Sequence, residues 1–596
     1  MNVSERIDSL RILMEEKGID AYIVPTADYH QSEYVGDYFK SRIFMTGFTG
    51  SAGTAVFTKT EAGLWTDGRY FIQAARQLEG SGVELRKMGE PGVPRIEEYL
   101  KKILPANGVI GFDGRTVGIE EGQIYESIAL SKGGHVVYED DLVDRIWKER
   151  PLLSNNPAFR LDVKYAGETT ASKLERIRKI MDEAGATAHL ITSLDDTGWL
   201  LNIRGRDVEY FPLLLSYTII RKDSVDLYAD AQKFDEQILK DFKDNNVKIY
   251  PYNDIYEAVK SFSSEEVIML DPRLVNYALY KNIPESIKMV KQNNPSILMK
   301  AMKNNVEVEN IKKAHIKDGV AHTRFMYWLK QNIGKTEITE LSASDKLEEL
   351  RASQGDFLGP SFEPICAFKE HAAIVHYSSS PETNVPLKKG ALFLTDTGGH
   401  YYEGSTDITR TVAMGEVSQV EKDHFTTVVA GMLKLADAKF LYGCSGMNLD
   451  YAARQVFWRQ NLNFNHGTGH GVGYLGNIHE TSARFNWKFQ PNGSDYKLEP
   501  NMVITDEPGI YIEGSHGIRI ENELLVCRGE KNEYGQFMYF EPLTYVPIDL
   551  DAVNPKLLTD EEKTLLNNYH NRVYELIGPH LTEEERTWLK EYTREI

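Results

Sequence analysis

Two pairs of acidic residues, each beside a glycine-rich turn, are the strongest candidates for chemistry in this sequence. The first pair, Asp396 and Asp407, lies in the segment TDTGGHYYEGSTDITRT. The apolar run 391–394 predicts a buried strand before it, and the β-branched segment 406–414 predicts a second strand after it. Antiparallel pairing of these strands could bring the two carboxylates together. Because two carboxylates about 5 Å apart repel by roughly 3 kcal/mol at an effective dielectric of about 20, the pair calls for a positive charge such as a multivalent metal ion.

The second acidic pair is Glu507 and Glu521. Residues 502–505 predict a strand that leads into Glu507, and residues 517–527 predict the strand that returns after a Pro-Gly turn. In the returning strand, isoleucine and leucine alternate with charged residues, which gives one apolar and one charged face. We therefore expect Glu507 and Glu521 to meet across this hairpin, and we interpret Asp506 and Glu523 as flanking charges.

A glycine-rich segment with two histidines, NHGTGHGVG at 465–473, lies between the two acidic pairs. Its glycines let the backbone approach a ligand closely, and they argue against a helix that presents both His466 and His470. Four carboxylates and an imidazole form an oxygen-rich set, which suits one or two ions such as Mn²⁺, Co²⁺ or Zn²⁺ better than a thiolate zinc site. Each motif alone is weak, since acidic turns are usually solvated loops, and their order along the chain is the stronger signal.

This ordered series resembles the pita-bread metallopeptidase family, which includes methionine aminopeptidase, prolidase and Xaa-Pro aminopeptidase. Further segments resemble the long, three-domain Xaa-Pro aminopeptidases: RIFMTGFTGSAG (42–53), LLNIRGRDVEYFP (200–212) and AAIVHY (372–377). One local departure is FKEH at 368–371, where the family usually has a smaller, more polar loop on the substrate side.

The resemblance implies a ligand set for two metal ions. Asp407 and Glu521 would bridge the two ions. Asp396 would hold one ion, and His470 with Glu507 would hold the other. Hydrolysis would proceed by attack of a water held between the ions, with Glu507 as the general base that passes a proton to the leaving nitrogen. Mn²⁺ is the expected metal, with Zn²⁺ or Co²⁺ as alternatives.

The resemblance also implies residues that contact the substrate. His376 and His479 would hydrogen-bond the scissile carbonyl oxygen as negative charge builds on it. Tyr511 and Arg519 match positions beside the substrate, although Arg519 could equally orient a ligand carboxylate. Without the resemblance, a lone histidine after an apolar run is more often a buried structural residue. We expect His466 to support the site rather than to bind metal.

The first half of the chain contains an internal duplication. KGIDAYIV at 17–24 matches AGATAHLI at 184–191, and TDGRYF at 66–71 matches ADAQKF at 229–234. The second match aligns Arg69 with Gln232, so the shared fold does not require an arginine there. Arg69 could therefore bind the distal part of a peptide or contact another domain, and an ordinary surface arginine is equally compatible with the pattern.

The predicted fold class is α/β, with an α+β catalytic domain. By the same resemblance, we expect two creatinase-like α/β domains at 1–155 and 156–303, a pita-bread metallopeptidase domain at 304–549, and a helical C-terminal extension at 550–596. The extension contains two capping-box sequences, which begin at Thr559 and Thr582 and predict two helices.

Composition excludes several other classes. The chain has 596 residues, 41% of them hydrophobic, and a net charge of −20, which favours a globular protein and weighs against a nucleic-acid partner. The most apolar-looking run, 210–220, contains a proline and is shorter than the roughly 20 residues that span a bilayer. The N-terminal segment lacks a signal-peptide core, and only three cysteines occur. We therefore expect a cytoplasmic enzyme without a membrane partner, and the family resemblance suggests a homodimer.

The predicted function is a metal-dependent aminopeptidase that releases the N-terminal residue from peptides with proline at the second position. The proline requirement rests on the resemblance, since a pocket must recognise a ring whose nitrogen carries no N–H. One alternative is a prolidase that cleaves X-Pro dipeptides, and another is a non-catalytic peptide-binding module. The duplicated N-terminal half disfavours the prolidase, and the complete ligand set disfavours the module.

Overall fold

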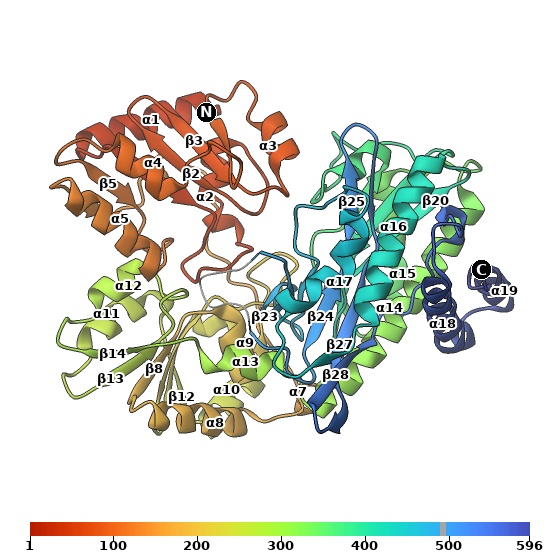
Figure 1. Cartoon of the computed structure of the whole chain (residues 1–596). Coiled ribbons are helices and arrows are strands. Elements are labelled where there is room, and N and C mark those ends of the chain that lie inside the picture. The colour runs from red at the N-terminus through yellow and green to blue at the C-terminus, as the bar shows by residue number, and fades with distance from the viewer. Residues whose placement is uncertain (489–495) are drawn as a thin grey trace. The chain divides into compact units, whose positions relative to one another are not determined.

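The computed structural model describes residues 1–488 and 496–596, and the chain forms two compact units (Figure 1). Unit 1 comprises Met1–Leu161 and Glu168–Ser296. Unit 2 comprises Asp162–Gly167 and Ile297–Ile596 and contains every predicted metal ligand.

Unit 1 contains two six-stranded sheets with the same topology. The strand orders are β4-β3-β2-β1-β5-β6 and β12-β11-β10-β8-β13-β14. In each sheet the central strand, β1 or β8, pairs antiparallel with one neighbour and parallel with the other. This shared order confirms the internal duplication predicted from the sequence.

The strands of the two sheets are β1 (Ala21–Pro25), β2 (Thr54–Thr58), β3 (Ala62–Thr66), β4 (Glu84–Lys87), β5 (Val109–Phe112), β6 (His135–Val137), β8 (Ala188–Ile191), β10 (Tyr217–Arg221), β11 (Val225–Tyr228), β12 (Val247–Tyr250), β13 (Val267–Leu270) and β14 (Lys288–Lys291). The longer helices of this unit are α1 (Val3–Glu16), α4 (Ile96–Ile103), α5 (Ile119–Ser131), α8 (Thr170–Glu183), α9 (Leu194–Leu201) and α10 (Glu236–Asp244).

The helices that open the two copies, α1 and α8, form for matching reasons. Asn2 and Thr169 cap their first turns by accepting backbone N–H groups. After each helix the chain turns at a glycine, Gly18 or Gly185, and both have φ of +66°. This left-handed conformation favours glycine, so the recurrence of glycine in both joints has a backbone cause.

Among the described residues, unit 2 contains one six-stranded sheet, three sheets of two or three strands, and six helices of ten residues or more. The strands are β15 (Phe357–Pro360), β16 (Ile365–Phe368), β17 (Ala391–Thr397), β18 (Gly399–Tyr401), β19 (Gly404–Ser405), β20 (Ile408–Met414), β21 (Phe440–Leu441), β22 (Gly469–Gly471), β23 (Glu480–Phe485), β24 (Val503–Asp506), β25 (Gly509–Ile512), β26 (His516–Arg519), β27 (Asn522–Asn532) and β28 (Gly535–Pro542). The helices are α14 (Asn305–Asn332), α15 (Glu340–Ala352), α16 (Gln419–Ala436), α17 (Gly446–Trp458), α18 (Asp560–Ile577) and α19 (Glu583–Tyr592). Among them, α16 packs against β24, β25 and β26 (Figure 1).

The first acidic hairpin has the predicted antiparallel pairing and an unpredicted insertion. Strand β17 pairs with β20, and Asp396 lies opposite Thr409. The chain between them is more than a turn, because it forms β18 and β19, which join β15 in a separate sheet. At the base of this insertion a Cβ on Gly398 would lie 1.8 Å from the carbonyl oxygen of Thr406. Only glycine, which has no Cβ, therefore fits at position 398.

The second acidic hairpin differs from the prediction in its returning segment, which is two strands rather than one. Strand β24 pairs with β27, whereas β25 pairs with β26 as a separate ribbon. Since Asp506 pairs with Asn522, the next residues outward, Glu507 and Glu521, lie opposite each other as predicted. Glu521 thus sits at the break where the chain changes strand partners.

The C-terminal helices α18 and α19 are packed parts of unit 2. The capping boxes at Thr559 and Thr582 are both formed. Val573, Ile577 and Leu589 are fully buried in a core that they share with α16. Burial of a side chain of this size stabilises the fold by about 1.5–3 kcal/mol, so these helices are anchored by hydrophobic packing.

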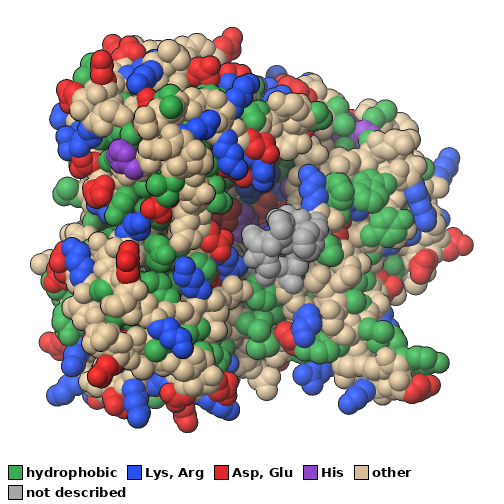
Figure 2. Space-filling view, turned by 60° about the vertical axis from the view of Figure 1, so that its left-hand side comes forward, with side chains coloured by type: hydrophobic (Ala, Val, Ile, Leu, Met, Phe, Trp, Pro, Cys, Tyr) green, Lys and Arg blue, Asp and Glu red, His purple; other side chains and the backbone are tan. Residues whose placement is uncertain are grey.

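Surface and covalent features complete the description. Acidic and basic side chains are interspersed on the face shown in Figure 2. Within the described ranges, no helix combines the length and the apolar character needed to cross a bilayer. Cys366, Cys444 and Cys527 are all free thiols.

Candidate metal centre

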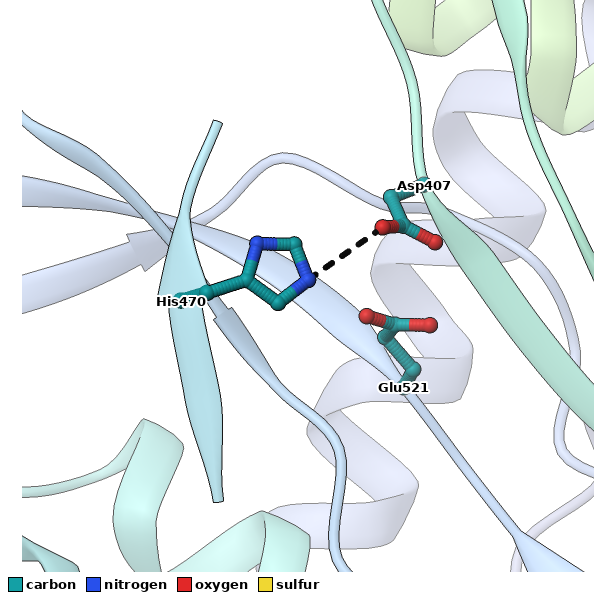
Figure 3. A group of neighbouring side chains, drawn as sticks. All are labelled: Asp407, His470 and Glu521. Atoms are coloured by element: carbon teal, nitrogen blue, oxygen red, sulfur yellow. Dashed lines mark ion pairs between the residues drawn. The ribbon is translucent and has the colours of Figure 1, made fainter. Parts of the chain in front are cut away.

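Residues from both hairpins and from the glycine-rich segment meet at one place (Figure 3). One ligand atom each from Asp407, His470 and Glu521 lies within 4.8 Å of the other two. His470 Nε2 is 3.5 Å from Asp407 Oδ2 and also 3.5 Å from Glu507 Oε1. Side chains separated by more than a hundred positions in the sequence therefore form a single cluster.

Asp396 is held by Arg519 and influences the cluster through its charge. The guanidinium Nε of Arg519 donates to Asp396 Oδ2 at 3.1 Å, and Nη2 donates to the same oxygen. Burial first, and then the negative charge of Asp396, raises the pKa of Asp407 well above its usual value. Asp396 thus acts on the same electrostatic environment as the other acids.

The cluster carries more negative charge than its protein surroundings neutralise. Burial, followed by the charges of Asp407 and Glu507, raises the pKa of Glu521. Burial also raises the pKa of Glu507, partly offset by His470 and Arg519. Among the described residues, Asp396 Oδ1, Asp407 Oδ1 and Glu521 Oε1 have no hydrogen-bond donor although they are buried. Buried carboxylates without partners are costly, and this oxygen-rich set with one imidazole fits divalent cations.

Hydrogen bonds around the cluster orient its members. His470 Nδ1 lies 2.9 Å from the carbonyl oxygen of Gly471, so Nδ1 carries the proton and Nε2 presents a lone pair to the acids. Thr409 Oγ1 donates to Glu521 Oε2 at 2.7 Å. Thr505 Oγ1 accepts the backbone N–H of His470 and donates to Glu507 Oε1. The side chains are therefore held in place by the protein itself.

Glycine at 469 is required by close packing of strand β22. A Cβ there would lie 1.8 Å from the carbonyl oxygen of Thr505. Strand β22, which carries His470, lies between β24 and β23 in the sheet. The glycine thus lets the backbone of β22 approach a neighbouring strand, whereas the sequence predicted an approach to a ligand.

Glu523 and Asp506 are not solvated flanking charges, contrary to the sequence interpretation. Both are fully buried. Glu523 Oε1 accepts the backbone N–H of Asp407 at 2.6 Å, so it supports the strand that presents Asp407. Glu523 shares strand parity with Glu521, and that alternation was the signal that could have revealed it.

Arg519 contacts Tyr511 and the segment that carries His376. Its Nη1 donates to the Tyr511 hydroxyl at 2.8 Å, and Nη2 donates to the backbone oxygen of Val375, next to His376, at 3.3 Å. The Tyr511 hydroxyl is also 2.8 Å from Nε2 of His466. Arg519 therefore links Asp396, a tyrosine and the segment that carries His376.

His479 lies against the metal-cluster histidine. The ring centroids of His470 and His479 are 4.2 Å apart, with the rings at 68°. The following residue, Glu480, forms a buried ion pair with Lys303 at 2.7 Å. The position of His479 is thus fixed by strand β23 and by this pair.

A residue that the sequence did not reveal, Glu340, anchors the segment 368–377. Its carboxylate is fully buried and accepts the backbone N–H of Phe368 at 2.7 Å and the hydroxyl of Tyr377 at 2.8 Å. His371 Nδ1 lies 2.9 Å from the same carboxylate. The unusual FKEH sequence therefore supplies a histidine that joins this anchor, close to His376.

Arg69 is the one predicted site residue that lies in unit 1. It forms a two-point contact with Asp67, with Nε at 2.8 Å from Oδ1 and Nη2 at 2.9 Å from Oδ2. Asp67 also accepts the backbone N–H of Arg69, as Asp230 accepts that of Gln232. The two aspartates thus stabilise matching turns in the two copies, and only the first copy adds the arginine.

The raised carboxyl pKa values predict how metal binding depends on pH. A carboxyl whose folded-state pKa lies above its unfolded value stabilises the fold at low pH, and this contribution is lost as pH rises through the folded-state pKa. The cluster should therefore destabilise the metal-free chain increasingly with pH. We expect the difference in Tm between metal-loaded and chelator-treated protein to widen from about pH 5.5 to about pH 8. A constant or narrowing difference in calorimetric scans would contradict this.

Comparisons with known proteins agree with this architecture along the whole chain. The creatinase/prolidase N-terminal domain matches residues 6–142 and again residues 149–307. Metallopeptidase family M24 matches 309–528, and the C-terminal region of peptidase M24 matches 536–596. The chain is thus a metallopeptidase of the M24, pita-bread class with two creatinase-like α/β domains before the catalytic domain, which confirms the predicted fold class.

Full-length relatives narrow the family further. Aminopeptidase P1 of Arabidopsis thaliana is 36% identical, with 100% of this chain and 99% of that protein covered. The probable Xaa-Pro aminopeptidase P of Tuber melanosporum is 35% identical, with 100% of both covered. The crystal structure of an X-prolyl aminopeptidase from Caenorhabditis elegans, described as a cytosolic enzyme with a di-nuclear active site, matches with a TM-score of 0.96, 35% identity and 100% coverage of both chains. This chain belongs to the aminopeptidase P family.

A shorter relative helps to separate the alternatives. The Xaa-Pro dipeptidase of Bacillus anthracis is 25% identical with a TM-score of 0.51, and the match covers 99% of that enzyme but 64% of this chain. The part of this chain without a counterpart there is about as long as one α/β domain with the C-terminal helices. The similarity to the dipeptidase is therefore partial.

Proposed function

We propose that this chain is a metal-dependent Xaa-Pro aminopeptidase, which releases the N-terminal residue from peptides with proline at the second position. The observation that carries this proposal is the convergence of Asp407, His470 and Glu521 in a chain that matches aminopeptidase P relatives over its full length. The extra length relative to the dipeptidase favours this activity over prolidase activity.

Five side chains would hold two divalent cations: Asp396, Asp407, His470, Glu507 and Glu521. Bound there, divalent cations polarise a carbonyl and make water a stronger nucleophile at neutral pH. The unpaired oxygens of the cluster and the lone pair on His470 Nε2 support this assignment. The di-nuclear site described for the relative from C. elegans supports the number of ions.

The residues around the proposed ions would have separate roles in the hydrolysis. Glu507 would accept a proton from the attacking water and pass it to the leaving nitrogen. His479 and His376 hydrogen-bond the carbonyl oxygen as it becomes negative. Arg519 orients Asp396 through two N–H groups, and Tyr511 contacts the substrate beside it.

The test is a panel of peptides assayed with purified, metal-stripped protein after readdition of Mn²⁺, Zn²⁺ or Co²⁺. We expect release of the first residue from Xaa-Pro-Pro, little release from Xaa-Ala-Ala, and activity restored best by Mn²⁺. An enzyme that cleaves only the X-Pro dipeptide would be a prolidase. Tight peptide binding without any hydrolysis under all three metals would identify a binding module instead.

Arg69 is proposed to bind the distal part of longer peptides. The support is the asymmetry between the two copies, since only the first carries an arginine on the shared turn. The Arg69→Gln variant, which copies the second domain, is expected to raise KM for peptides of five or more residues by about tenfold, or roughly 1.4 kcal/mol, and to leave tripeptide kinetics unchanged. Equal changes in KM for tripeptides and for longer peptides would show that Arg69 only stabilises its turn.

Three broader features are also proposed. The free cysteines and the cytosolic relative support a cytoplasmic location, which cell fractionation can check. A homodimer can be checked by light scattering. The sequence-derived domain limits 1–155, 156–303, 304–549 and 550–596 are supported by the two sheets, each of which falls within one of the first two ranges, and limited proteolysis should cut near these limits.

A further inference from the structure

A buried arginine on strand β20, Arg410, has an unusual set of partners. Its guanidinium is 1% exposed, and the hydrogen bonds described for it go to neutral oxygens rather than to carboxylates. Nη1 donates to the backbone oxygens of Thr409 at 2.8 Å and Glu521 at 2.6 Å. Nη2 donates to Asn522 Oδ1 at 2.7 Å and to the backbone oxygen of Val546 at 2.9 Å.

These contacts place Arg410 at the break between β26 and β27. The backbone oxygen of Glu521 and the side chain of Asn522 are both held by the one planar guanidinium. Because that break lacks the regular pairing of a strand interior, the arginine supplies hydrogen bonds that fix the backbone of Glu521. It also brings a positive charge next to the cluster of acids.

The remaining partner of Arg410 comes from the C-terminal helix α18. The Tyr569 hydroxyl accepts from Arg410 Nη2 at 2.7 Å and from the backbone N–H of Val546 at 3.2 Å. It lies 2.8 Å from the Val546 oxygen, to which it can donate its own proton. Tyr569 is itself 8% exposed, so this polar contact is closed off from solvent.

We propose that helix α18 is a positioning element of the metal centre, which acts through Tyr569 and Arg410 on Glu521. This rests on the proposed role of Glu521 as a metal ligand. Tyr569 fixes the guanidinium, the guanidinium fixes the backbone of Glu521, and Thr409 fixes the carboxylate of Glu521. The C-terminal extension thereby takes part in the function of the catalytic domain as well as in its packing.

The test compares Tyr569→Phe with Tyr574→Phe in the full-length chain. Tyr574 lies on the same helix and packs against the same core, and its hydroxyl makes no hydrogen bond to the described residues. After removal of metal, Mn²⁺ affinity is measured by calorimetry, the metal-free Tm by scanning, and kcat and KM on Xaa-Pro-Pro. We expect Tyr569→Phe to weaken Mn²⁺ binding by about 10- to 100-fold, as loss of an outer-sphere partner typically does, and to lower kcat with little change in KM.

The control and the second variant decide between positioning and packing. Tyr574→Phe should bind Mn²⁺ as the wild type does. Arg410→Lys, which keeps the charge but loses the planar fork, should weaken Mn²⁺ binding in the same way as Tyr569→Phe. If Tyr569→Phe lowers only the metal-free Tm and binds Mn²⁺ with wild-type affinity, α18 serves packing alone and the inference is overturned. Failure of the wild-type chain to bind metal or cleave Xaa-Pro-Pro would instead overturn the proposed function.

Discussion

Replacement of Asp407 by asparagine is expected to abolish hydrolysis while leaving the metal-free fold as stable as the wild type, or more stable. Asp407 is 4% exposed, and its Oδ1 has no hydrogen-bond donor in the described part of the chain. The substitution removes a buried like charge from the cluster, so repulsion in the metal-free state falls. It also removes a proposed bridging ligand, and kcat/KM should drop by about 10³-fold or more, which is roughly 4 kcal/mol of transition-state stabilisation.

The measurement pairs activity with stability, because the two should move in opposite directions. Metal content and kcat/KM are determined after Mn²⁺ loading, and Tm is determined after treatment with a chelator. Asp345→Asn, on the exposed side of α15, is the matched control and should change neither quantity. Normal turnover by Asp407→Asn would falsify the bridging assignment.

Replacement of Arg519 by alanine has the second-largest expected effect. The two contacts from Arg519 to Asp396 form a buried ion pair, and removal of one member of such a pair leaves an uncompensated charge at a cost of about 3–5 kcal/mol. The same change releases Tyr511 and the backbone before His376. We expect kcat to fall by about 10²- to 10³-fold, together with a clear loss of stability in the metal-free chain.

Lysine at position 519 separates charge from geometry. A lysine ammonium keeps the positive charge but cannot make the planar contacts of a guanidinium, so Arg519→Lys should retain stability better than Arg519→Ala and recover only part of the activity. Arg528→Ala, at an exposed position of β27, serves as the control. Full activity in Arg519→Lys would show that charge alone suffices and that Arg519 does not orient Asp396.

The acidic pairs could be predicted because strand alternation and antiparallel pairing are local rules. Asp396 and Asp407 flank one hairpin, and Glu507 and Glu521 flank another, so short-range patterns carried most of the information. The splitting of the second hairpin into β24–β27 and β25–β26 was not predicted, because Ile518, Ile520 and Leu524 share one alternation with charged residues and Asn522 alone interrupts it. The contacts of these strands with α16 are distant in sequence, and the local pattern does not encode them.

Residues that support the site from distant parts of the sequence could not be predicted, for a different reason. Glu340 and Tyr569 lie in helices α15 and α18, and nothing local in the sequence distinguishes them from ordinary surface or core residues. Their roles arise from contacts with Phe368, Tyr377 and Arg410. Such contacts are set by the way that helices pack on the sheets, which residue spacing within a helix does not encode.

The way that the acids are positioned has a consequence for which metal ions the protein acquires. Asp396 lies within the ladder of β17 with β20, whereas Glu507 and Glu521 lie just beyond the last pair of β24 with β27. Strand pairing and the contact from Arg410 to the backbone of Glu521 together position these donors. Carboxylate and imidazole donors accept several divalent ions. The ion acquired should follow cellular supply, and the same gene expressed in manganese-rich and zinc-rich media should give preparations of different specific activity.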